Sequence, residues 1–420
     1  MIHDAFLPPG VAPPPTAAVE RHGVLYRSAV WSGEALAAVA HALRDRGAPA
    51  LAALDPARLR DAWLDTVDLF LDPASAERRA LDRPLAAFCG LSPAGLRAGL
   101  EAVLGGARRG AAELIEEARP AGDGRAVLVV LAANLPGLAV QPLLPALALR
   151  RPVLLKSPSA EPLFAPAFLA ALARREPALA PALAAAVWRG GDRALEDPLL
   201  AAAGRVVAYG ERDSLDDLEA RAAGRLFGYG PRTSLAVVAA GEDPAAVASG
   251  LARDVALFDQ RGCLSVQAVY TDAPARPLAD ALAAELAVLA ERWPPGPADP
   301  ASAAGVQQLR AEAELRGLHR PPLPLAAGTV VVEPLPAFSP APGLRSVRIH
   351  PLPDLGRLPG LLAPWRDRLQ GAALAGAAAE ALRPELERLG LTRFAAPGRL
   401  QHPDALWHNG GLHPLEVLAE

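Results

Sequence analysis

The chain has 420 residues, of which 51% are hydrophobic and 21% are charged, and its formal net charge is −4. This length suits two or three domains with a large buried core. A slightly acidic chain without a basic cluster offers no electrostatic basis for binding nucleic acid. Only two cysteines occur, far apart in the sequence, which favours a reducing cytoplasm over a disulfide framework.

The first 124 residues are predicted to be mostly helical. Residues 1 to about 30 are loop-like, with one short strand candidate near Val24–Tyr26 and no pattern of a secretory signal. Helical patterns follow over Glu34–Arg46, Pro56–Phe70, Ser75–Leu81 and Ser92–Leu104. Cys89 lies among apolar residues in this region, so we interpret it as structural.

Short apolar strands alternate with helices in the next hundred residues. Strand patterns occur at Arg125–Leu131, Pro152–Lys156, Ala186–Trp188, Arg205–Tyr209 and Arg225–Tyr229. The stretch Ala126–Leu149 is long and apolar enough to cross a bilayer, but Asn134, Gly137 and three prolines divide it into strand, turn and helix. We therefore predict no membrane span here, and a doubly wound α/β domain whose ligands bind beyond the carboxyl ends of the strands.

A second α/β unit is predicted after residue 233. Its strand patterns are Ser234–Ala240, Leu264–Tyr270, Thr329–Glu333 and Ser346–Ile349. Helical patterns cover Asp243–Phe258, Pro277–Arg292, Pro300–Arg316, most of Pro353–Leu369 and most of Ala372–Leu389. The remaining residues, from 396, form a tail with a polar turn at residues 407–411.

The second cysteine, Cys263, follows a glycine between a helical pattern and a strand pattern. Gly262 leaves the backbone free to turn and allows a substrate to approach closely. Gln260, Arg261 and Ser265 make the surroundings polar. A thiol in such surroundings serves as a nucleophile if they favour the thiolate, whereas a free cysteine is commonly a small buried hydrophobe. These residues alone leave both interpretations open.

Two residue types that are rare in this chain occur at predicted strand ends. Lys156 is the only lysine among 42 basic residues, and Asn134 is one of two asparagines. The composition is skewed toward Ala, Leu, Pro, Arg and Gly, so a rare residue that persists suggests that no other residue serves. Ser159, Gly190 and Gly210 also follow predicted strands, where ligands of such sheets bind.

Several familiar functional motifs are absent. The chain has no G-x-x-x-x-G-K-[ST] phosphate loop, no H-E-x-x-H, no paired C-x-x-C and no G-x-S-x-G elbow. The eight histidines lack metal-ligand spacing, apart from the loose group His402, His408 and His413, so we predict no metal site. The Gly228 and Gly230 pair lacks the third glycine of a dinucleotide fingerprint.

A set of motifs, in their order and spacing, resembles the aldehyde dehydrogenase superfamily. The similarity is greater to its acyl-CoA reductase branch, the family of the fatty-acid reductase component of bacterial luciferase systems. The motifs are residues 132–137 (AANLPG), 153–159 (VLLKSPS), 207–210 (VAYG), 227–230 (FGYG), 254–265 (DVALFDQRGCLS) and 407–410 (WHNG). The resemblance runs from about Pro84 to the C-terminus. It implies an α/β fold with an NAD(P)-binding domain at residues 125–233 and a catalytic domain at 234–395, after the helical region 1–124 and before the tail 396–420.

The resemblance also implies roles for single residues. Cys263 matches the nucleophile, and the Asn134 amide and the Cys263 backbone N–H match the donors to the oxyanion. Lys156 matches a lysine that binds the adenosine ribose of the cofactor. Three residues on, NAD-preferring relatives carry a glutamate, and this chain has Ser159, which would not repel a 2′-phosphate. NADPH is therefore favoured, with NADH as the alternative. Four further residues are expected along the cofactor: Gly190, Gly210, Glu211 and, near the nicotinamide ribose, Glu333.

One departure from the wider superfamily bears on the reaction. Hydrolytic aldehyde dehydrogenases have a Glu-Leu-Gly-Gly motif whose acid activates water, and the matching stretch Phe227–Arg232 has no acid. The resemblance thus implies NADPH-dependent reduction of a long-chain acyl-CoA to the aldehyde through an acyl-cysteine. The alternatives are a carrier-protein thioester or another acyl donor, with a carrier or acyl-transferase as partner, and a non-catalytic scaffold. The sequence leaves open whether the chain forms a homo-oligomer.

Overall fold

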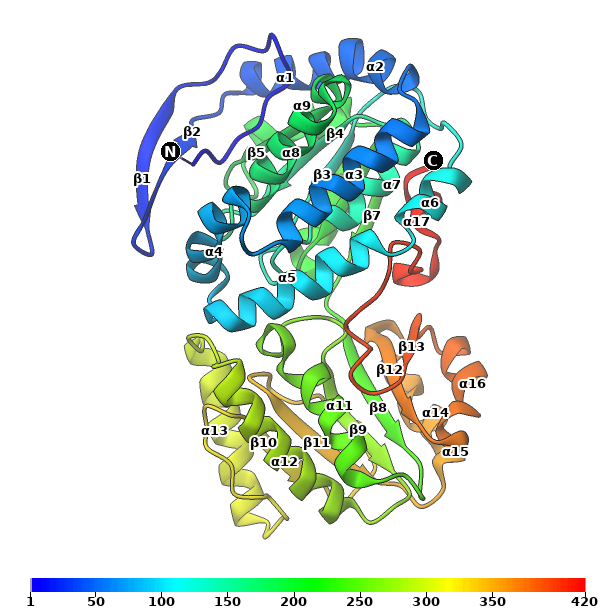
Figure 1. Ribbon diagram of the computed structural model, residues 1–420. Coiled ribbons are helices and arrows are strands. Elements are labelled where there is room, and N and C mark those ends of the chain that lie inside the picture. Colours follow the sequence, from blue (N-terminus) through cyan, green and yellow to red (C-terminus); the bar gives the residue numbers. More distant parts are fainter. Residues whose placement is uncertain (1, 420) are drawn as a thin grey trace.

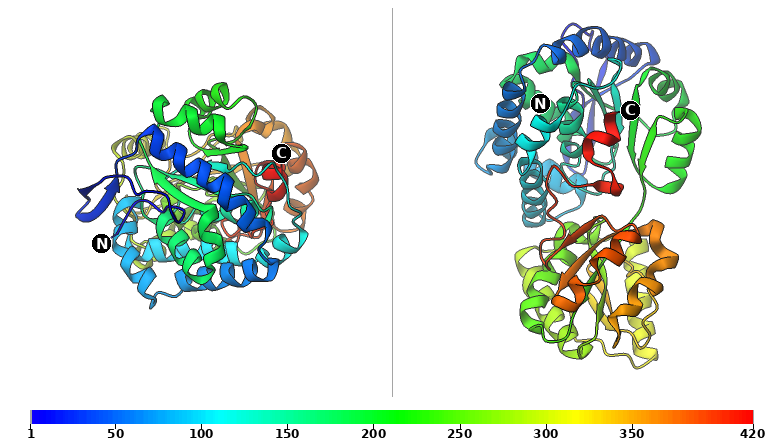
Figure 2. Two further views of the ribbon diagram at one scale, coloured as in Figure 1. Left: turned by 90° about the horizontal axis from the view of Figure 1, so that it is seen from above. Right: turned by 90° about the vertical axis from the view of Figure 1, so that its right-hand side faces the viewer.

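Two parallel sheets, one in each of two lobes, organise the chain (Figure 1). The computed structural model describes residues 2–419. One lobe contains the N-terminal half and a five-stranded sheet, and the other contains a six-stranded sheet (Figure 2). The expected α/β class, with a helical region ahead of the first sheet, is confirmed.

The first sheet has the strand order β5-β4-β3-β6-β7, and every neighbouring pair is parallel. Its strands are β3 (Val127–Val130), β4 (Val153–Ser157), β5 (Leu183–Val187), β6 (Arg205–Tyr209) and β7 (Leu226–Tyr229). The three central strands are nearly continuous apolar runs because helices cover both faces of the sheet. The order reverses between β3 and β6, which is where doubly wound sheets open a crevice for ligands.

Helices that pack on one face of this sheet are α3 (Pro56–Leu71), α5 (Pro93–Arg108), α6 (Ala111–Glu117), α7 (Val140–Ala148) and α8 (Phe164–Arg175). On the other face lie α1 (Gly33–Ala42), α9 (Arg193–Ala202) and α10 (Arg212–Ala222). The candidate membrane stretch is divided into β3, a loop and α7, as predicted. Among residues 2–419, no helix is long and apolar enough to cross a membrane.

The N-terminal region contains a hairpin, of which the sequence pattern indicated only the second strand, near Val24–Tyr26. Strands β1 (Thr16–Arg21) and β2 (Val24–Ala29) pair in antiparallel fashion, and β1 has no apolar alternation because its side chains are largely exposed. The helices α2 (Ala48–Ala52) and α4 (Ala76–Cys89) complete the region, and α4 extends beyond its predicted end. Cys89 is buried, and burial raises the pKa of its thiol, which fits a structural role.

The second sheet has the order β10-β11-β9-β8-β12-β13, again entirely parallel. Its strands are β8 (Thr233–Val238), β9 (Val266–Thr271), β10 (Thr329–Val332), β11 (Ser346–Pro351), β12 (Leu369–Ala375) and β13 (Arg393–Ala395). Helices α11 (Pro244–Ala256) and α12 (Ala275–Arg292) cover one face, α13 (Pro300–Leu315) packs beside β10, and the other face holds α14 (Leu358–Leu362), α15 (Ala377–Glu380) and α16 (Arg383–Arg388).

The helix predicted from Ala372 is wrong at its start. Residues Leu369–Ala375 form strand β12, which lies inside the sheet between β8 and β13 and is buried along its whole length. A β-carbon on Gly371 would lie 2.9 Å from the Arg393 carbonyl oxygen, so the small residues allow β13 and the core to pack closely. Tertiary packing overrides the helical preference of alanine here.

The two sheets follow one another almost without interruption. Only residues 230–232 separate the end of β7 from the start of β8. The carboxyl edge of the first sheet therefore faces the amino edge of the second (Figure 1). After β13 the chain returns to the first lobe, where the C-terminal helix α17 (Pro414–Ala419) packs against α7 (Figure 2).

Candidate active site

A cavity of about 660 Å³ lies where the two sheets face each other. The first sheet contributes the segments that follow β3 and β6, and the second contributes the loop before β9 and the start of β12. Cys263, Asn134, Gly210 and Glu211 all line it. The structure thus brings together four of the residues that the sequence singled out.

The loop before Cys263 has an unusual backbone that the second lobe holds in place. Phe258, Asp259 and Gln260 have positive φ angles of 57°, 50° and 64°, which is costly for residues other than glycine. The Asp259 carboxylate accepts hydrogen bonds from Arg345 Nε at 3.0 Å and from the Gly296 N–H at 2.9 Å. These buried contacts stabilise the strained turn, so it is a fixed part of the site.

Gln260 fastens the same turn to the second sheet. Its Nε2 donates to the carbonyl oxygens of Val266 at 2.7 Å and Ser346 at 2.6 Å, and its Oε1 accepts from the Ser346 N–H at 2.8 Å. Gln260 therefore completes main-chain bonding between two strands while its own backbone turns toward the cavity. The turn at residues 258–260 therefore determines where Cys263 enters the cavity.

Gly262 is required by space rather than by its φ angle. A β-carbon here would lie 2.9 Å from Oε1 of Gln401, whose Nε2 donates to the Asp254 carbonyl at 2.6 Å. Gln401 belongs to the returning tail, so the tail packs directly against the Cys263 loop. The Ser234 hydroxyl donates to the Cys263 carbonyl at 2.8 Å and fixes the far side of the cysteine.

The Cys263 thiol is half-buried, and its pKa lies above its ordinary value. Burial raises its pKa to about 11, against smaller lowering effects from its own N–H, the Arg232 charge and the Leu264 N–H. Two backbone N–H groups and one cation thus favour the thiolate and would also favour negative charge that develops on a bound carbonyl oxygen.

Asn134 approaches this loop from the first sheet. Its Nδ2 donates to the Arg261 carbonyl at 3.1 Å, while Arg261 itself donates through Nη1 to Cys89 O at 2.6 Å and through Nη2 to Gly90 O at 2.9 Å. The amide is exposed at the cavity surface, so a substrate carbonyl can compete for its N–H. Arg261 joins the Cys263 loop to the N-terminal helices, a contact that sequence reasoning did not indicate.

Aromatic and amide side chains that the sequence analysis did not single out complete the wall. Tyr209 and Tyr229 stack with ring centroids 4.7 Å apart, and burial, with the proximity of Tyr229 and Cys263, raises the pKa of Tyr209. Arg232 donates to the Leu369 carbonyl at 3.0 Å. The rest of the polar lining includes Gln141, Gln267, Gln370, Gln401, Asp404 and Asn409. Asn409 lies in a quoted motif and Gln267 lies just beyond one, whereas Gln370 and Gln401 had no such sequence signal.

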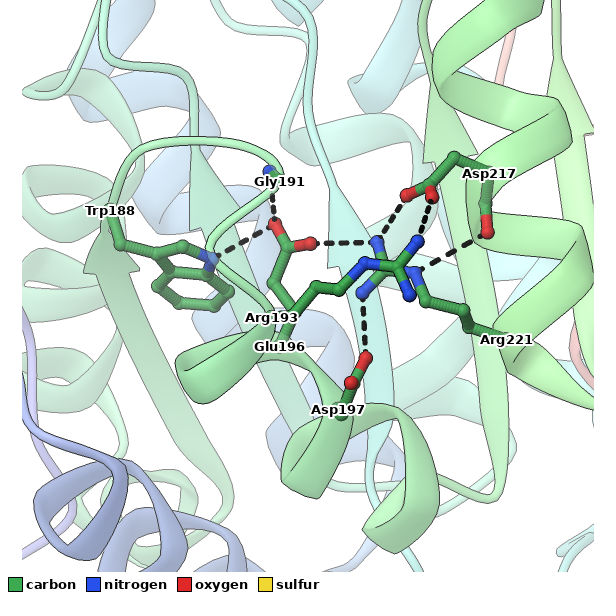
Figure 3. Close-up of polar contacts among 7 residues, drawn as sticks. All are labelled: Trp188, Gly191, Arg193, Glu196, Asp197, Asp217 and Arg221. Atoms are coloured by element: carbon green, nitrogen blue, oxygen red, sulfur yellow. Dashed lines mark hydrogen bonds and ion pairs between the residues drawn. The ribbon is translucent and has the colours of Figure 1, made fainter.

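Lys156 lies outside the cavity, in a buried polar cluster at the carboxyl end of β4. Its Nζ is 5.4 Å from the centre of the Trp188 ring, and burial lowers its pKa while the charge of Glu196 opposes that shift. Glu196 Oε1 accepts from Trp188 Nε1 and from the Gly191 N–H, both at 3.2 Å. Figure 3 shows this carboxylate aimed at the turn after β5.

Arg221 neutralises Glu196 and links two helices. Its Nη2 donates to Glu196 Oε2 and its Nη1 to Asp197 Oδ1, both at 2.8 Å, and it also pairs with Asp217 of its own helix (Figure 3). Helices α9 and α10 are thereby held together beside the turn that carries Gly190. Glu196 is a polar group of this region that the sequence analysis missed.

The remaining predicted cofactor residues occupy different environments. Ser159 and Gly190 are on exposed turns after β4 and β5, and the Ser159 carbonyl accepts a hydrogen bond from Arg21 of the hairpin. Glu161 is buried, and its Oε1 accepts from the N–H groups of Leu163 and Phe164, so its carboxylate is engaged at the start of α8. Open turns and a lysine at the carboxyl ends of β4 and β5 suit a dinucleotide with an anionic pyrophosphate.

Glu333 is not brought to the cavity. It follows β10, and its carboxylate pairs with Arg348 and, at 3.7 Å, with Arg316. Because the second sheet is parallel, this position is at the carboxyl edge, whereas Cys263 precedes the amino end of β9. The strand register brings Glu333 close to the level of Tyr270, seven residues beyond Cys263.

The tail residues around His408 have structural contacts. The Trp407 indole N–H donates to the Thr392 carbonyl at 3.1 Å, and Asn409 Oδ1 accepts from Gln370 Nε2 at 3.1 Å. The exposed His408 ring packs edge-on against His413 at 5.2 Å. Within residues 2–419, no group of three or more His, Cys, Asp or Glu side chains is placed to hold a metal ion.

Solved structures that are similar to this chain include several aldehyde dehydrogenases. An indole-3-acetaldehyde dehydrogenase of P. syringae, solved with NAD+ and IAA, matches with a TM-score of 0.77 at 15% identity over 100% of this chain and 96% of its own. An NADP-dependent glyceraldehyde-3-phosphate dehydrogenase from Bacillus halodurans, complexed with NADP, matches with 0.69 at 16% identity over 91% and 87%. An aldehyde dehydrogenase C from Pseudomonas syringae, complexed with NAD+ and octanal, matches with 0.71 at 14% identity over 93% and 88%. The fold is that of the aldehyde dehydrogenases.

The family follows from the sequence itself. The family model for acyl-CoA reductase (LuxC) matches residues 111–420, and the chain belongs to this family. No curated protein matches the chain in sequence. Fold and family together define an oxidoreductase of the aldehyde dehydrogenase type, in agreement with the predicted resemblance.

Proposed function

We propose that the protein reduces a long-chain acyl-CoA thioester to the aldehyde with NADPH, through an acyl group on Cys263. The observation that carries this proposal is the cavity in which Cys263, its backbone N–H and the Asn134 amide meet. The segment 227–232, where hydrolytic relatives carry an acid, contributes Arg232 instead. The two carboxylates of the lining, Glu211 and Asp404, belong to exposed residues.

The chemistry requires two successive attacks on one carbonyl carbon. The Cys263 thiolate adds to the thioester carbonyl, the oxyanion is stabilised by the Asn134 amide and the Cys263 N–H, and the coenzyme A thiolate leaves. When bound, the cofactor supplies a hydride to the same carbon. Collapse of the resulting hemithioacetal breaks the C–S bond, returns the thiolate and releases the aldehyde. One thioester, one NADPH and one proton give one aldehyde, one NADP+ and free coenzyme A.

The apolar part of the cavity lining favours a long apolar acyl chain as the substrate group. There α5, α7 and the returning tail contribute small and aliphatic side chains: Ala102, Val103, Leu138, Val140, Leu144, Ala405, Leu412, Val417 and Leu418. We refer to this part of the cavity as the acyl arm. Apolar lining with a few converging polar groups is typical of pockets that bind small molecules.

The test of the covalent step uses the protein without NADPH. Incubation with an acyl-CoA is expected to release one equivalent of coenzyme A and to add the acyl mass to the peptide that contains Cys263. The Cys263→Ala variant should form neither aldehyde nor adduct while its NADPH affinity is unchanged, and the Cys89→Ala variant serves as the matched cysteine control. Aldehyde formation by Cys263→Ala would overturn the mechanism.

The acyl donor and the cofactor need separate tests. Matched acyl groups on coenzyme A and on a carrier protein identify the donor, and a strong preference for the carrier would favour the alternative function. For the cofactor, Ser159→Glu places a carboxylate where a 2′-phosphate is expected, so the ratio of NADPH to NADH efficiency should fall about tenfold or more. Ser159→Gln is the neutral control, and an equal loss in both variants would contradict 2′-phosphate binding at this turn.

A further inference from the structure

We propose that the C-terminal helix α17 is the end wall of the acyl arm and that Val417 and Leu418 limit the length of the acyl chain. This inference rests on the proposed function, because it assigns the far end of the same cavity. Both side chains line the cavity and are almost fully buried, with 3% and 1% of their surfaces exposed. The neighbouring Leu415 of the same helix does not line it.

Strand β6 gives the direction in which the arm runs. Tyr209, at the carboxyl end of β6, lines the cavity where Cys263 lies. Arg205, at the amino end of the same strand, donates through Nε to the Val417 carbonyl at 2.8 Å. A strand of five residues spans about 13 Å. The cavity therefore extends from the carboxyl edge of the first sheet toward its amino edge, and α17 stands at the end remote from the thiol.

Two arginines hold this wall in place. Arg205 bonds the Val417 carbonyl, and Arg151 Nη1 bonds the Leu418 carbonyl, so guanidinium groups cap the last turn of a helix that is too short to be stable by itself. Both arginines stand at or just before the start of a strand of the first sheet. The helix is thus fixed to the rigid sheet rather than left as a loose terminus.

The approach to α17 is also fixed, but by different contacts. The Ala405 N–H donates to the Arg109 carbonyl at 2.9 Å, and Arg109 Nη2 donates back to the His402 carbonyl at 3.0 Å. A β-carbon on Gly106 would lie 2.2 Å from the Pro403 carbonyl oxygen, so α5 and the tail are in direct contact. Because α5 and the tail close this side of the acyl arm, the side chains of α17 determine how long an acyl chain the arm can hold.

The test compares variants that lengthen and shorten the arm. Leu418→Ala removes part of the end wall and should shift the preferred chain to longer acyl-CoAs, with about a tenfold rise in the ratio of kcat/KM for a long chain over a medium one. Val417→Phe fills the end and should shift the same ratio in the opposite direction by a similar factor. Leu415→Ala removes the same atoms from the same helix outside the cavity and should leave the ratio within about twofold of the native value.

The readout is a ratio within each variant, so a general loss of stability or activity cancels. Val417→Leu, which adds a single methylene, replaces Val417→Phe if the larger side chain prevents folding. The proposal is overturned if the Leu418→Ala and Val417 variants keep the native ratio, or if Leu415→Ala shifts it as much as Leu418→Ala.

The proposed function and this inference fail in distinguishable ways. If the native protein reduces no acyl thioester, the function fails, and binding of fatty acids of graded length still tests the wall through the increase in melting temperature that each ligand produces. The length giving the largest increase should then be greater in Leu418→Ala than in the native protein. Unchanged length dependence in all variants would refute the wall whether or not the reductase activity is found.

Discussion

The two parallel sheets present opposite edges to the same cavity. The first sheet contributes residues that follow its strands, such as Asn134 after β3 and Gly210 after β6. The second contributes residues that precede its strands or begin them, such as Cys263 before β9 and Gln370 in β12. The difference arises because residues 230–232 join β7 to β8 and bring the carboxyl edge of one sheet to the amino edge of the next.

The rule that ligands bind at the carboxyl ends of parallel strands therefore applies to only one of the sheets. In the first sheet a strand-end side chain needs only a short loop to reach the crevice. In the second sheet the position of Cys263 depends on a turn with three positive φ angles, held by Asp259 and Gln260. The first half of the site uses the general geometry of the fold, and the second half uses specific buried hydrogen bonds.

The largest expected effect tests whether the two edges act as one site. Asn134→Ala removes the amide that the first sheet directs at the nucleophile loop, and kcat should fall by about 10²- to 10³-fold, as for other oxyanion donors. Asn134→Asp keeps the shape, removes the donor and should lose at least as much. Steady-state kinetics with one acyl-CoA measures the change, and native activity in Asn134→Ala would show that the edges act separately.

A smaller effect is expected on the cofactor side of the first sheet. Lys156→Met should raise the KM for NADPH by about tenfold because a hydrogen bond from a charged group is lost, with little change in kcat. Lys156→Arg retains the charge beside Trp188 and Glu196 and should recover part of the affinity. Titration of NADPH by its fluorescence gives the dissociation constant directly, and an unchanged constant in Lys156→Met would remove Lys156 from the cofactor site.

Much of the fold could be predicted from the sequence because buried parallel strands have a distinct texture. The predicted strands Arg125–Leu131 and Pro152–Lys156 are rich in valine and leucine, and the structure has strands β3 and β4 there. The alanines of strand β12 from Ala372 were predicted as helix because alanine carries no strand signal. The strand there is explained by its packing, as at Gly371, whose neighbours leave no room for a side chain. Hairpin strand β1 is largely exposed and has no apolar alternation to detect.

Site residues that belong to a motif could be predicted from the sequence. Site residues that reach the cavity only through the packing of separate segments could not. Asn134 and Cys263 were indicated by motif and order, and the cavity contains both. Tyr209, Gln401 and Arg232 reach the cavity because separate segments converge there, and no spacing in the sequence expresses that convergence. Lys156 was correctly predicted at the end of a strand. Its neighbour Glu196 lies in helix α9, and no motif in the sequence links the two residues.

A moderate effect is expected from the charge that the segment between the two sheets brings to the thiol. The Arg232 guanidinium favours the Cys263 thiolate, so Arg232→Gln should raise the pKa of this thiol above its value of about 11. Alkylation at a fixed pH below that value should then slow by up to about tenfold, which corresponds to one pKa unit. Rates of iodoacetamide labelling across pH measure the shift. Arg366→Gln removes an exposed arginine as the control, and equal rates in both variants would contradict the role of Arg232.

The smallest effect on activity is expected at the carboxyl edge of the second sheet. Glu333 is engaged by Arg348 and Arg316 at the edge away from the thiol, so Glu333→Gln should leave kcat and the KM for NADPH within about twofold. The same change should lower the free energy of unfolding by about 1–3 kcal/mol because a largely buried ion pair is broken. Denaturation and kinetics on the same sample separate the two results. A large rise in the KM for NADPH with unchanged stability would mean that the carboxyl edges of both sheets serve the cofactor, and the distinction between the sheets would then fail.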